Sequence, residues 1–326
     1  MQNKKEKINP ENFRFSKIIV TGGSGFIGSH LVEKLVELDA NVTVIDDLRN
    51  CSKENLFKVI KRIKFIDSPV EDVFSEILKS CDDFKYVFHL ANESYVPPSI
   101  DDPFSDLKNN VLSTLKILET IRQSSASVCL LYVSSAAVYG EPGPLPIDEL
   151  RLPKPISPYG LSKLAAEQYV SLYSRLHGLK TSSLRLFSVY GPRQRKQVVY
   201  DFFRKLIKDP NEIEILGDGS QARDFVFVED VVKALLSVSC KSSFNGEVYN
   251  VGTSEMITTQ ELATKISSIM DLSPRLKFTG KTRKGDPEKW QADILKINKI
   301  GFYPEITIDK GLEKVWDWLK SNVEKD

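Results

Sequence analysis

The sequence has 326 residues, which is enough chain for about two domains of roughly 100–200 residues each. Its 45 Lys and Arg balance 44 Asp and Glu to a net charge of +1, so charge gives no reason to expect nucleic acid or an anionic membrane as a partner. No apolar run approaches the ~18 residues of a membrane helix. Four scattered cysteines and three histidines favour reduced thiols in the cytoplasm over a disulfide framework, and no metal centre is expected.

The first half of the chain alternates short apolar runs with helical patterns. Strands are predicted, in chain order, at 17–22, 41–46, 63–67, 85–91, 128–134 and 180–187. Helices are predicted at 26–38, 52–61, 70–80, 103–122 and 157–176. This alternation predicts a doubly wound parallel sheet with helices on both faces. Residues 1–15 are basic, lack the apolar middle of a secretion signal, and are expected to form a flexible leader.

The pattern changes after residue 190, where Gly191-Pro192 interrupts the alternation. Helices are predicted at 200–208, 231–239, 258–270 and 312–321, and Asp218-Gly219 supplies the turn of a predicted hairpin. The second half therefore predicts a smaller α+β lobe that is partly interleaved with the first. We place the first domain at 16–188, with segments at about 225–255 returning to it, and the second lobe mainly at 189–326.

A glycine-rich turn follows the first predicted strand. The segment TGGSGFIGSH contains Gly23-x-Gly25-x-x-Gly28 and the overlapping spacing Gly22-x-x-Gly25-x-x-Gly28. Glycines at these spacings allow a tight turn, close approach of the backbone to a pyrophosphate, and close packing of helix on strand. The strand before the motif and the helix after it match the dinucleotide-binding fingerprint, although a purely structural glycine turn stays open at this point.

Asp46 ends the second predicted strand, 21 residues after Gly25. A carboxylate there can accept hydrogen bonds from both ribose hydroxyls and would repel a 2′-phosphate. Asp47 adds a second negative charge, with Arg49 close behind. The prediction is therefore NAD in preference to NADP, and the alternative is a solvated strand end.

Two further segments carry groups suited to proton transfer. Tyr159 and Lys163 stand at i and i+4 of a helix for which Ser157 is the predicted N-cap, so their side chains share one face. An ammonium near the phenol favours the phenolate, which can act as a general base. Ser134 and Ser135 close the fifth predicted strand at the edge where open α/β sheets bind ligands, although serines at a strand end are common without such a role.

Together these segments resemble the extended short-chain dehydrogenase/reductase family, and within it the nucleotide-sugar epimerases of the UDP-glucose 4-epimerase type. Other segments that share the resemblance are HLA at 89–91, NNV at 109–111, RLFSVYGPRQ at 185–194, GDGSQARDFVFVEDVV at 217–232, YNVG at 249–252 and RKGD at 283–286. The resemblance extends over about residues 17 to 323. It implies an α/β, Rossmann-type fold that binds NAD, with a smaller lobe that binds a nucleotide sugar.

The resemblance also assigns roles to residues. Tyr159 would be the catalytic acid/base, Lys163 its electrostatic partner and a ribose ligand, and Ser135 the hydroxyl that bonds to the sugar oxygen being oxidised. Cofactor contacts besides Tyr159 and Lys163 would come from Gly22, Gly25, Phe26, Ile27, Gly28, Asp46, Asp67, Ser68, Leu90, Ala91, Asn109 and Phe187. The substrate would be bound by Ser135, Ser188, Arg223, Arg283, Asp286 and Trp290, with the two arginines clamping its diphosphate.

Three of the matching positions bear on the choice of sugar. Ser188 stands where the family often has an asparagine that touches substrate, and Glu93 puts a carboxylate either near the sugar or toward solvent. Trp290 stands where relatives wall the pocket around the sugar's 2-substituent, so a bulky indole predicts exclusion of N-acetylated sugars. The alternative is that Trp290 only anchors the C-terminal lobe.

The function that the resemblance implies is NAD-dependent epimerisation at C4 of a nucleotide-linked hexose, foremost UDP-glucose and UDP-galactose, through a transient 4-keto sugar. One alternative is an NAD(P)H-dependent reductase of a nucleotide-linked 4-keto-6-deoxy sugar. Another is a non-catalytic nucleotide sensor, which should have lost Tyr159 or Lys163. Ala136 and Ala137 lack the ionisable groups that dehydratase and decarboxylase relatives carry there. The family also implies a cytoplasmic homodimer joined by a four-helix bundle of 103–122 and 157–176.

Overall fold

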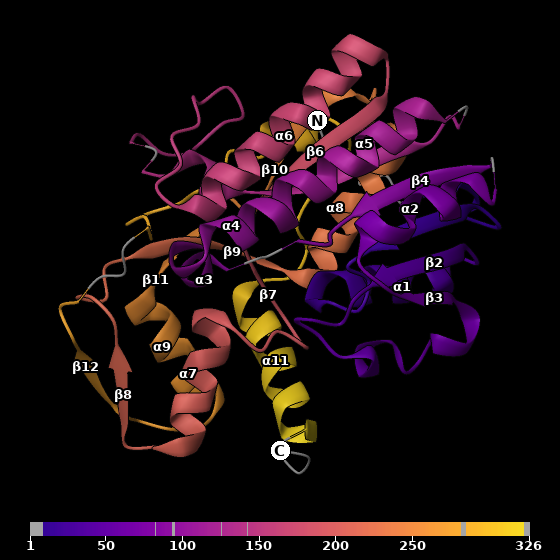
Figure 1. The fold of residues 1–326 in the computed structure, drawn as a ribbon. Helices are drawn as coiled ribbons and strands as arrows, with labels where there is room; N and C mark the ends of the chain where they lie inside the picture. Colours follow the sequence, from indigo (N-terminus) through magenta and orange to yellow (C-terminus); the bar gives the residue numbers. More distant parts are fainter. Residues whose placement is uncertain are drawn as a thin grey trace.

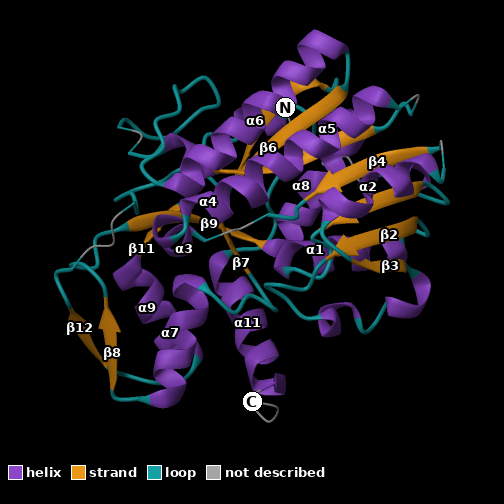
Figure 2. Cartoon of the chain, viewed as in Figure 1, coloured by secondary structure: helices purple, strands orange, loops and turns teal. Residues whose placement is uncertain are grey.

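A seven-stranded parallel sheet forms the larger lobe of the molecule (Figures 1 and 2), with strand order β10-β6-β5-β4-β1-β2-β3. The computed structural model describes residues 9–81, 83–92, 95–124, 126–141, 143–281 and 285–322. The strands of this sheet are β1 (Lys17–Thr21), β2 (Asn41–Asp46), β3 (Lys64–Asp67), β4 (Phe84–His89), β5 (Cys129–Ser135), β6 (Lys180–Leu186) and β10 (Asn245–Val251). The predicted doubly wound Rossmann-type sheet is thereby confirmed.

Helices cover both faces of this sheet because successive strand residues point to opposite sides. In β1, Ile18 and Val20 pack in one core, whereas Ile19 packs in the other. The first core is shared with α1 (Phe26–Glu37) and α8 (Val228–Lys241). The second is shared with α2 (Val70–Lys79), α5 (Ser113–Gln123) and α6 (Pro158–His177). Strands buried on both faces explain the nearly continuous apolar runs of the sequence.

The smaller lobe packs helices against two short sheets. Its helices are α7 (Gln197–Lys208), α9 (Thr259–Ile269) and α11 (Ile308–Asn322). One sheet has the order β11 (Met256–Thr258), β9 (Ala222–Phe227), β7 (Ser188–Tyr190), and the other pairs β12 (Arg275–Phe278) with β8 (Glu212–Ile215). The predicted hairpin at Asp218-Gly219 is wrong, because β8 and β9 lie in different sheets. The turn residues mark where the chain reverses, but they do not decide which strands pair.

The chain returns from the smaller lobe to the large sheet after β9. Helix α8 packs against α1, and β10 then pairs with β6 in parallel as an edge strand. The short helix α10 (Leu295–Asn298) packs against β10 later in the sequence. The two lobes are therefore interleaved along the chain.

Several predicted elements differ in the structure. The helix predicted at 52–61 is replaced by two 3-10 helices, η2 (Lys53–Leu56) and η3 (Ile60–Arg62). The helix predicted at 103–122 is divided into α4 (Pro103–Leu107), a π-helical turn η4 (Lys108–Leu112) and α5. The remaining short helices are α3 (Val96–Asp101), η1 (Pro10–Asn12) and η5 (Ala136–Tyr139).

The prediction of a flexible leader at 1–15 is wrong for the described residues 9–15. Residues 1–8 lie outside the described part, but Pro10–Asn12 forms a 3-10 helix. Phe13 is fully buried, with its ring centroid 5.9 Å from that of Tyr86 on β4. An aromatic side chain of this size stabilises the fold when buried, so residues near Phe13 are held against the sheet.

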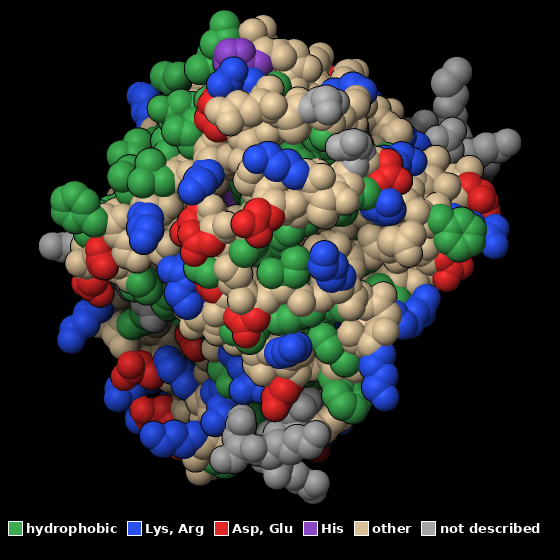
Figure 3. All heavy atoms as spheres, turned by 45° about the vertical axis from the view of Figure 1, so that its right-hand side comes forward, with side chains coloured by type: hydrophobic (Ala, Val, Ile, Leu, Met, Phe, Trp, Pro, Cys, Tyr) green, Lys and Arg blue, Asp and Glu red, His purple; other side chains and the backbone are tan. Residues whose placement is uncertain are grey.

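The described helices include none with both the length and the apolar composition needed to cross a membrane. On the face shown in Figure 3, acidic and basic side chains are interspersed, in keeping with a net charge of +1. Among the described residues, no group of three or more His, Cys, Asp and Glu side chains is placed to hold a metal ion.

Candidate active site

A cavity of about 960 Å³ lies at the carboxyl ends of the parallel strands and is lined by residues of both lobes. Strand β1 has β2 on one side and β4 on the other, so the chain order reverses at β1. In an open α/β sheet, a crevice forms at such a switch point and binds the ligand. The sequence motifs converge on this cavity from the ends of β1, β2, β4, β5 and β6.

The glycine-rich turn connects β1 to α1 beneath the cavity. Gly22 has a φ of +69°, and a Cβ atom there would lie 2.6 Å from the backbone nitrogen of Ala91. A Cβ at Gly28 would lie 2.1 Å from the carbonyl oxygen of Gly22. Both glycines are therefore required by close backbone approach. Gly25, Phe26 and Ile27 line the cavity, so the amino end of α1 faces it, and the N-cap Gly25 has no side chain to cap the first backbone N–H groups.

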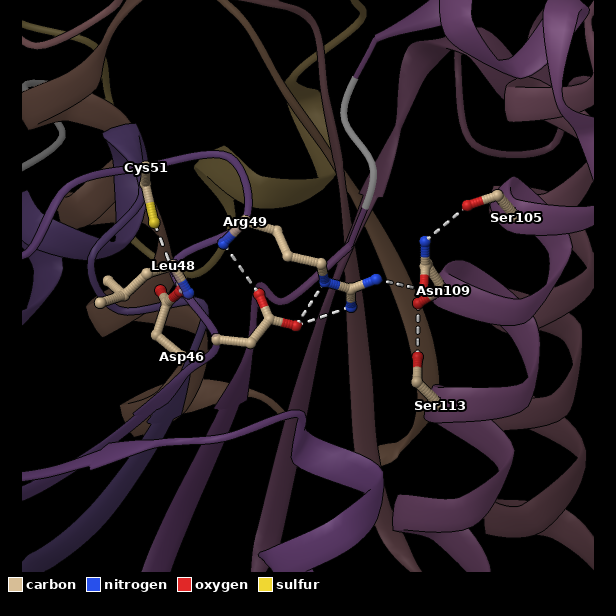
Figure 4. A network of polar contacts seen from close by, with 8 residues as sticks. Asp46, Leu48, Arg49, Cys51, Ser105, Asn109 and Ser113 are labelled. Carbon is tan, nitrogen blue, oxygen red and sulfur yellow. Dashed lines mark hydrogen bonds and ion pairs between the residues drawn. The ribbon is translucent and has the colours of Figure 1, made fainter.

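Asp46 is fixed at the end of β2 by backbone amides. Its carboxylate accepts hydrogen bonds from the Ser24 nitrogen at 2.8 Å and from the Leu48 nitrogen at 3.0 Å. The Cys51 thiol also donates to it, at 3.3 Å (Figure 4). Asp46 is buried and lines the cavity, so its carboxylate is held in one position beside the glycine-rich turn.

Tyr159 stands in the first turn of α6, which Ser157 caps through a 3.1 Å hydrogen bond from the Gly160 nitrogen. The Tyr159 nitrogen donates to the Ser99 hydroxyl of α3 at 3.0 Å, which fixes the helix start. Burial raises the pKa of Tyr159 to about 12, and a hydrogen bond with the Ser135 hydroxyl opposes that rise. The prediction from the sequence was a lowered pKa for this phenol, because the nearby ammonium was considered and burial was not.

Lys163 lies one turn further along α6 and is almost completely buried. Its amine donates to the carbonyl oxygen of Val133 at 2.6 Å and lies 4.9 Å from the ring centroid of Tyr132. Burial lowers the pKa of Lys163 to about 7, while the charges of Asp106 and Glu167 oppose this shift. The amine is therefore poised to change its charge near neutral pH.

The structure separates the roles of the two serines at the end of β5. Ser135 lines the cavity together with Tyr159, accepts a 3.1 Å hydrogen bond from the Ala137 nitrogen, and lies close enough to the phenol to oppose the rise of its pKa. The hydroxyl of Ser134 is buried and has no hydrogen-bond partner among the described residues. Ser135 is thus the serine placed beside the phenol.

Most of the predicted cofactor residues line this one cavity. They are Gly22, Gly25, Phe26, Ile27, Gly28, Asp46, Ser68, Leu90, Ala91, Asn109, Tyr159, Lys163 and Phe187. Asp67 is not among the lining residues; it is exposed at the end of β3, because β3 is the edge strand of the sheet. Ser68 lines the cavity directly after Asp67, and the adenine contact of these two residues stays a prediction.

The predicted substrate residues line the other end of the cavity, and they are Ser135, Ser188, Arg223, Asp286 and Trp290. The predicted Arg283 lies outside the described residues, as does Glu93. The Arg223 guanidinium is held by the carbonyl oxygens of Pro287 at 2.5 Å and Glu288 at 2.9 Å, and it lies 3.7 Å from the Asp286 carboxylate.

Trp290 reaches from the small lobe to the large one. Its indole nitrogen donates to the Gly140 carbonyl at 2.9 Å, and its ring meets Phe187 edge to face at 6.5 Å between centroids. Arg223 lies over the indole, 5.4 Å from the ring centroid. Because Trp290 also lines the cavity, it is both an anchor between the lobes and part of the cavity wall.

Sequence reasoning missed a group of basic residues at the small-lobe end of the cavity. These residues are Arg195, Lys196, Lys205 and Lys281. The run RQRK at 193–196, directly after Gly191-Pro192, was the available indication for two of them. Positive charge here suits a substrate that carries phosphate.

The large-lobe end of the cavity fits the pyrophosphate and ribose of NAD. A turn that a Cβ atom would obstruct lets the backbone approach a phosphate, and the amino end of α1 favours its negative charge. Asp46 supplies the hydrogen-bond acceptor for ribose hydroxyls at the end of β2. The residues present are therefore those that such a dinucleotide needs.

Comparison with known proteins gives a consistent result. Residues 18–252 match the model of the NAD dependent epimerase/dehydratase family. A UDP-glucose 4-epimerase of Mycolicibacterium smegmatis is 32% identical over 311 residues, which cover 94% of this chain and 99% of that protein.

Solved structures agree with the sequence comparison. The UDP-glucose 4-epimerase of Thermotoga maritima with UDP-glucose has a TM-score of 0.88 at 33% identity, over 94% of this chain and 99% of that one. A UDP-N-acetylglucosamine 4-epimerase of Methanobrevibacter ruminantium, in complex with UDP-N-acetylmuramic acid, has a TM-score of 0.88 at 31% identity, over 95% and 99%. Similar folds thus serve different sugars.

Proposed function

Since the chain belongs to the NAD dependent epimerase/dehydratase family, we propose that it interconverts UDP-glucose and UDP-galactose by inversion at C4. It is an NAD-dependent nucleotide-sugar epimerase; the identity of the sugar and of the base is the proposal. The observation that carries it is the meeting of Ser135 and Tyr159 in one cavity with the glycine-rich turn on one side and Arg223 on the other.

The two lobes divide the binding work in this proposal. Residues 16–188, with the later segments that return to the large sheet, hold NAD along the ends of β1, β2 and β4. Residues 189–326 mainly hold the nucleotide sugar, with Arg223 as the cation nearest to its diphosphate. Guanidinium groups suit this task because they present several N–H donors in a plane.

Tyr159 performs the proton transfers. It removes the proton of the sugar 4-hydroxyl, while the Ser135 hydroxyl bonds to the same oxygen and stabilises its developing charge. Bound NAD supplies the hydride acceptor and donor for a transient oxidation at C4, and its positively charged ring favours the phenolate of Tyr159. The 4-keto sugar turns about its diphosphate, and Tyr159 returns the proton on the oxygen of the inverted carbon. Ala136 and Ala137, buried beside Ser135, provide no further acid or base for dehydration.

The direct test is conversion of UDP-galactose by purified protein with no added reductant. We expect UDP-glucose to accumulate to equilibrium, with NAD regenerated in each turnover and no net change in the nicotinamide absorbance. A strict requirement for added NADPH, with stoichiometric consumption, would contradict the epimerase proposal and favour reduction of a 4-keto-6-deoxy sugar.

Tyr159→Phe tests the assignment of the acid/base. The change removes the only group that the proposal uses to move the proton, so we expect kcat to fall on the order of 10²–10⁴-fold. NAD binding, followed by titration of the stripped protein, should stay near that of the wild type, because the ring and its packing remain. Activity within a few-fold of the wild type would disprove this role for Tyr159.

We also propose that the enzyme is a homodimer. Leu161, Leu172 and Leu176 form a stripe along the outer face of α6 with exposed fractions of 59%, 40% and 64%, and Phe104 on the adjacent α4 is 83% exposed. Apolar residues at this spacing fit a helix face that packs against a partner, and a second copy would complete a four-helix bundle.

Sedimentation or light scattering tests the dimer. Changing both Leu172 and Leu176 to Glu should convert a dimer to a monomer. Phe57→Glu alters a residue that is 82% exposed and adjoins Leu56, which packs in the core on the α1 face of the sheet rather than in the core shared with α6, so it should leave the dimer intact. A wild-type protein that is monomeric at micromolar concentration would refute the proposal.

The cytoplasm is the proposed compartment. All four cysteines are unpaired in the structure, and burial raises the pKa of Cys129 and Cys240. Such thiols are typical of a reducing environment. Fractionation of the native host with an antibody against the protein would test this placement.

A further inference from the structure

Arg49 reaches from one wall of the cofactor cleft to the other (Figure 4). At the near wall its Nε donates to the Asp47 carboxylate at 2.7 Å, and a terminal nitrogen lies 2.6 Å from the same carboxylate. At the far wall another terminal nitrogen donates to the side-chain oxygen of Asn109 at 3.1 Å. The guanidinium therefore joins the loop after β2 to the helical segment that follows β4.

Both ends of this bridge are anchored. Asp47 follows Asp46, whose carboxylate is fixed by two backbone amides, and Asp47 itself accepts a 3.2 Å hydrogen bond from the Arg49 nitrogen. Asn109 is buried in the π-helical turn η4 and donates to the Ser105 hydroxyl at 3.1 Å. The Ser113 hydroxyl donates to its backbone carbonyl at 2.5 Å. Arg49 itself has 53% of its side chain exposed.

The bridge crosses the cleft at the switch point of the sheet. Asp46, Arg49, Asn109 and the glycine-rich turn all line the same cavity, and the turn is where a pyrophosphate fits. The pyrophosphate carries two negative charges in NAD and in NADH alike, and a guanidinium that lines the same cavity would attract it in either state. Its attraction therefore does not depend on the redox state of the nicotinamide.

We propose that Arg49 is a cofactor strap: it bridges Asp47 and Asn109 over the bound dinucleotide and slows the release of NAD and NADH equally. An enzyme that oxidises and then reduces its substrate must not lose the reduced cofactor between the two steps. A contact that acts on the pyrophosphate meets this need in both states. The proposal rests on NAD dependence alone and not on which hexose is the substrate.

The test compares cofactor dissociation from wild-type protein, Arg49→Ala and Arg49→Lys. Stripped proteins are reloaded with NAD or NADH, and release is followed by rapid filtration for NAD and by loss of NADH fluorescence. We expect Arg49→Ala to release both forms roughly 10- to 100-fold faster, by the same factor, because charge-assisted hydrogen bonds are lost. Arg49→Lys keeps the charge but cannot bridge two anchors, so it should fall between the two.

Arg62→Ala is the matched control. Arg62 is 58% exposed and pairs with Asp39 at 3.4 Å in the same lobe, but it does not line the cavity, so its removal should leave both release rates unchanged. The thermal midpoint of each stripped variant shows that it is folded. Unchanged or slower release from Arg49→Ala would overturn the proposal.

The test of the Arg49 strap and the test of the proposed sugar substrate can fail independently of each other. If UDP-galactose is not converted, the release rates of NAD and NADH still decide the role of Arg49. If the release rates do not respond to Arg49→Ala, the conversion of UDP-galactose still decides the proposed function.

Discussion

Lys163 is an amine that the fold keeps out of water, with 1% of the residue exposed. The amine donates a hydrogen bond to the carbonyl oxygen of Val133 and lies over the ring of Tyr132. Burial nevertheless favours its neutral form and lowers its pKa to about 7. Because the unfolded chain holds this proton up to a pKa near 10.5, folding releases a proton between these two values. The residue therefore links stability to pH.

Replacing Lys163 with Met should reveal this linkage in the NAD-stripped protein. Below about pH 7, the wild type carries the full cost of a buried ammonium, and its stability recovers as pH rises through the folded pKa. We therefore expect Lys163→Met to be more stable than the wild type at pH 6.5–7. That advantage should shrink by about 1.4 kcal/mol per pH unit toward pH 10.

Thermal denaturation of both proteins across this pH range is the measurement, with Lys116→Met on the exposed face of α5 as the control. The control should show no pH-dependent difference from the wild type. A constant difference between Lys163→Met and the wild type from pH 7 to pH 10 would contradict the burial of a titrating amine.

At the scale of elements, the four-residue spacing along α6 places the residues of the candidate site and a buried ion pair on the same face of the helix. Tyr159, Lys163 and Glu167 follow one another at intervals of four and face inward. Glu167 is fully buried and forms two hydrogen bonds with the Arg185 guanidinium of β6, at 2.6 and 3.0 Å. Arg185 also donates to the Tyr139 hydroxyl at 2.7 Å. This ion pair therefore ties α6, and with it Tyr159, to the sheet.

Glu167→Gln should destabilise the protein by about 3–5 kcal/mol, because it leaves the Arg185 charge buried without a counter-charge. Combining Glu167→Leu with Arg185→Met should lower the free energy of unfolding much less than Glu167→Gln does, because neither buried charge remains. Glu37→Gln, which breaks an exposed pair with Lys34, should change stability by about 1 kcal/mol or less. Thermal midpoints measured at pH 7 test this order of destabilisation among the three variants. Equal effects of Glu167→Gln and Glu37→Gln would refute the idea that the buried ion pair of Glu167 holds α6 on the sheet.

Elements with a local cause were predictable from the sequence. The strands of the large sheet are continuous apolar runs, and α6 has its own cap at Ser157 and a stop at Gly178, whose φ is +68°. The pairing of β8 with β12 was not predictable, because their partner segments are 60 residues apart and no turn joins them. The 3-10 helices at 53–62 replaced a predicted helix because this segment follows the contours of the cleft and buries only Leu56 and Val59.

The residues of the candidate site also divide into those that could be predicted from the sequence and those that could not. Gly22, Gly28, Asp46, Ser135 and Tyr159 could be found because each lies in a short motif whose spacing has a physical reason. Arg49 could not, because its role depends on Asn109, which is 60 residues away and reaches it only through the fold. The exposure of Asp67 was not predictable for a similar reason: it follows from β3 being the edge strand, and strand order is a property of the whole sheet.

On the scale of the whole molecule, Trp290 joins the lobes at the cavity. Its indole bonds to Gly140 of the large lobe while its backbone nitrogen donates to Ala222 of the small lobe at 3.1 Å. Its large ring meets Phe187 and lines the same cavity as Ser188, so it takes up space in the part of the wall predicted to surround the sugar. We therefore expect kcat/KM for UDP-glucose and UDP-galactose to exceed that for the N-acetylhexosamine pair by tenfold or more.

Two substitutions separate the wall from the anchor. Trp290→Ser should reduce the preference for UDP-glucose and UDP-galactose over the N-acetylhexosamine pair, because a smaller side chain leaves more space at this part of the cavity wall. Trp290→Phe keeps most of the bulk and loses the hydrogen bond to Gly140, so it should lower stability while leaving the preference in place. Equal kcat/KM for both sugar pairs in the wild type, measured by coupled assay, would disprove the role of Trp290 in sugar choice.

Strand β10 also has a consequence for synthesis on the ribosome. The large sheet cannot be completed until residue 251 has left the exit tunnel, although six of its seven strands are finished by residue 186. During that interval the nascent chain presents β6 as an open edge with unpaired backbone groups. A protein cut at residue 188 would keep that edge permanently, so it should aggregate, and the cofactor-binding half should not be obtainable as a separate soluble fragment.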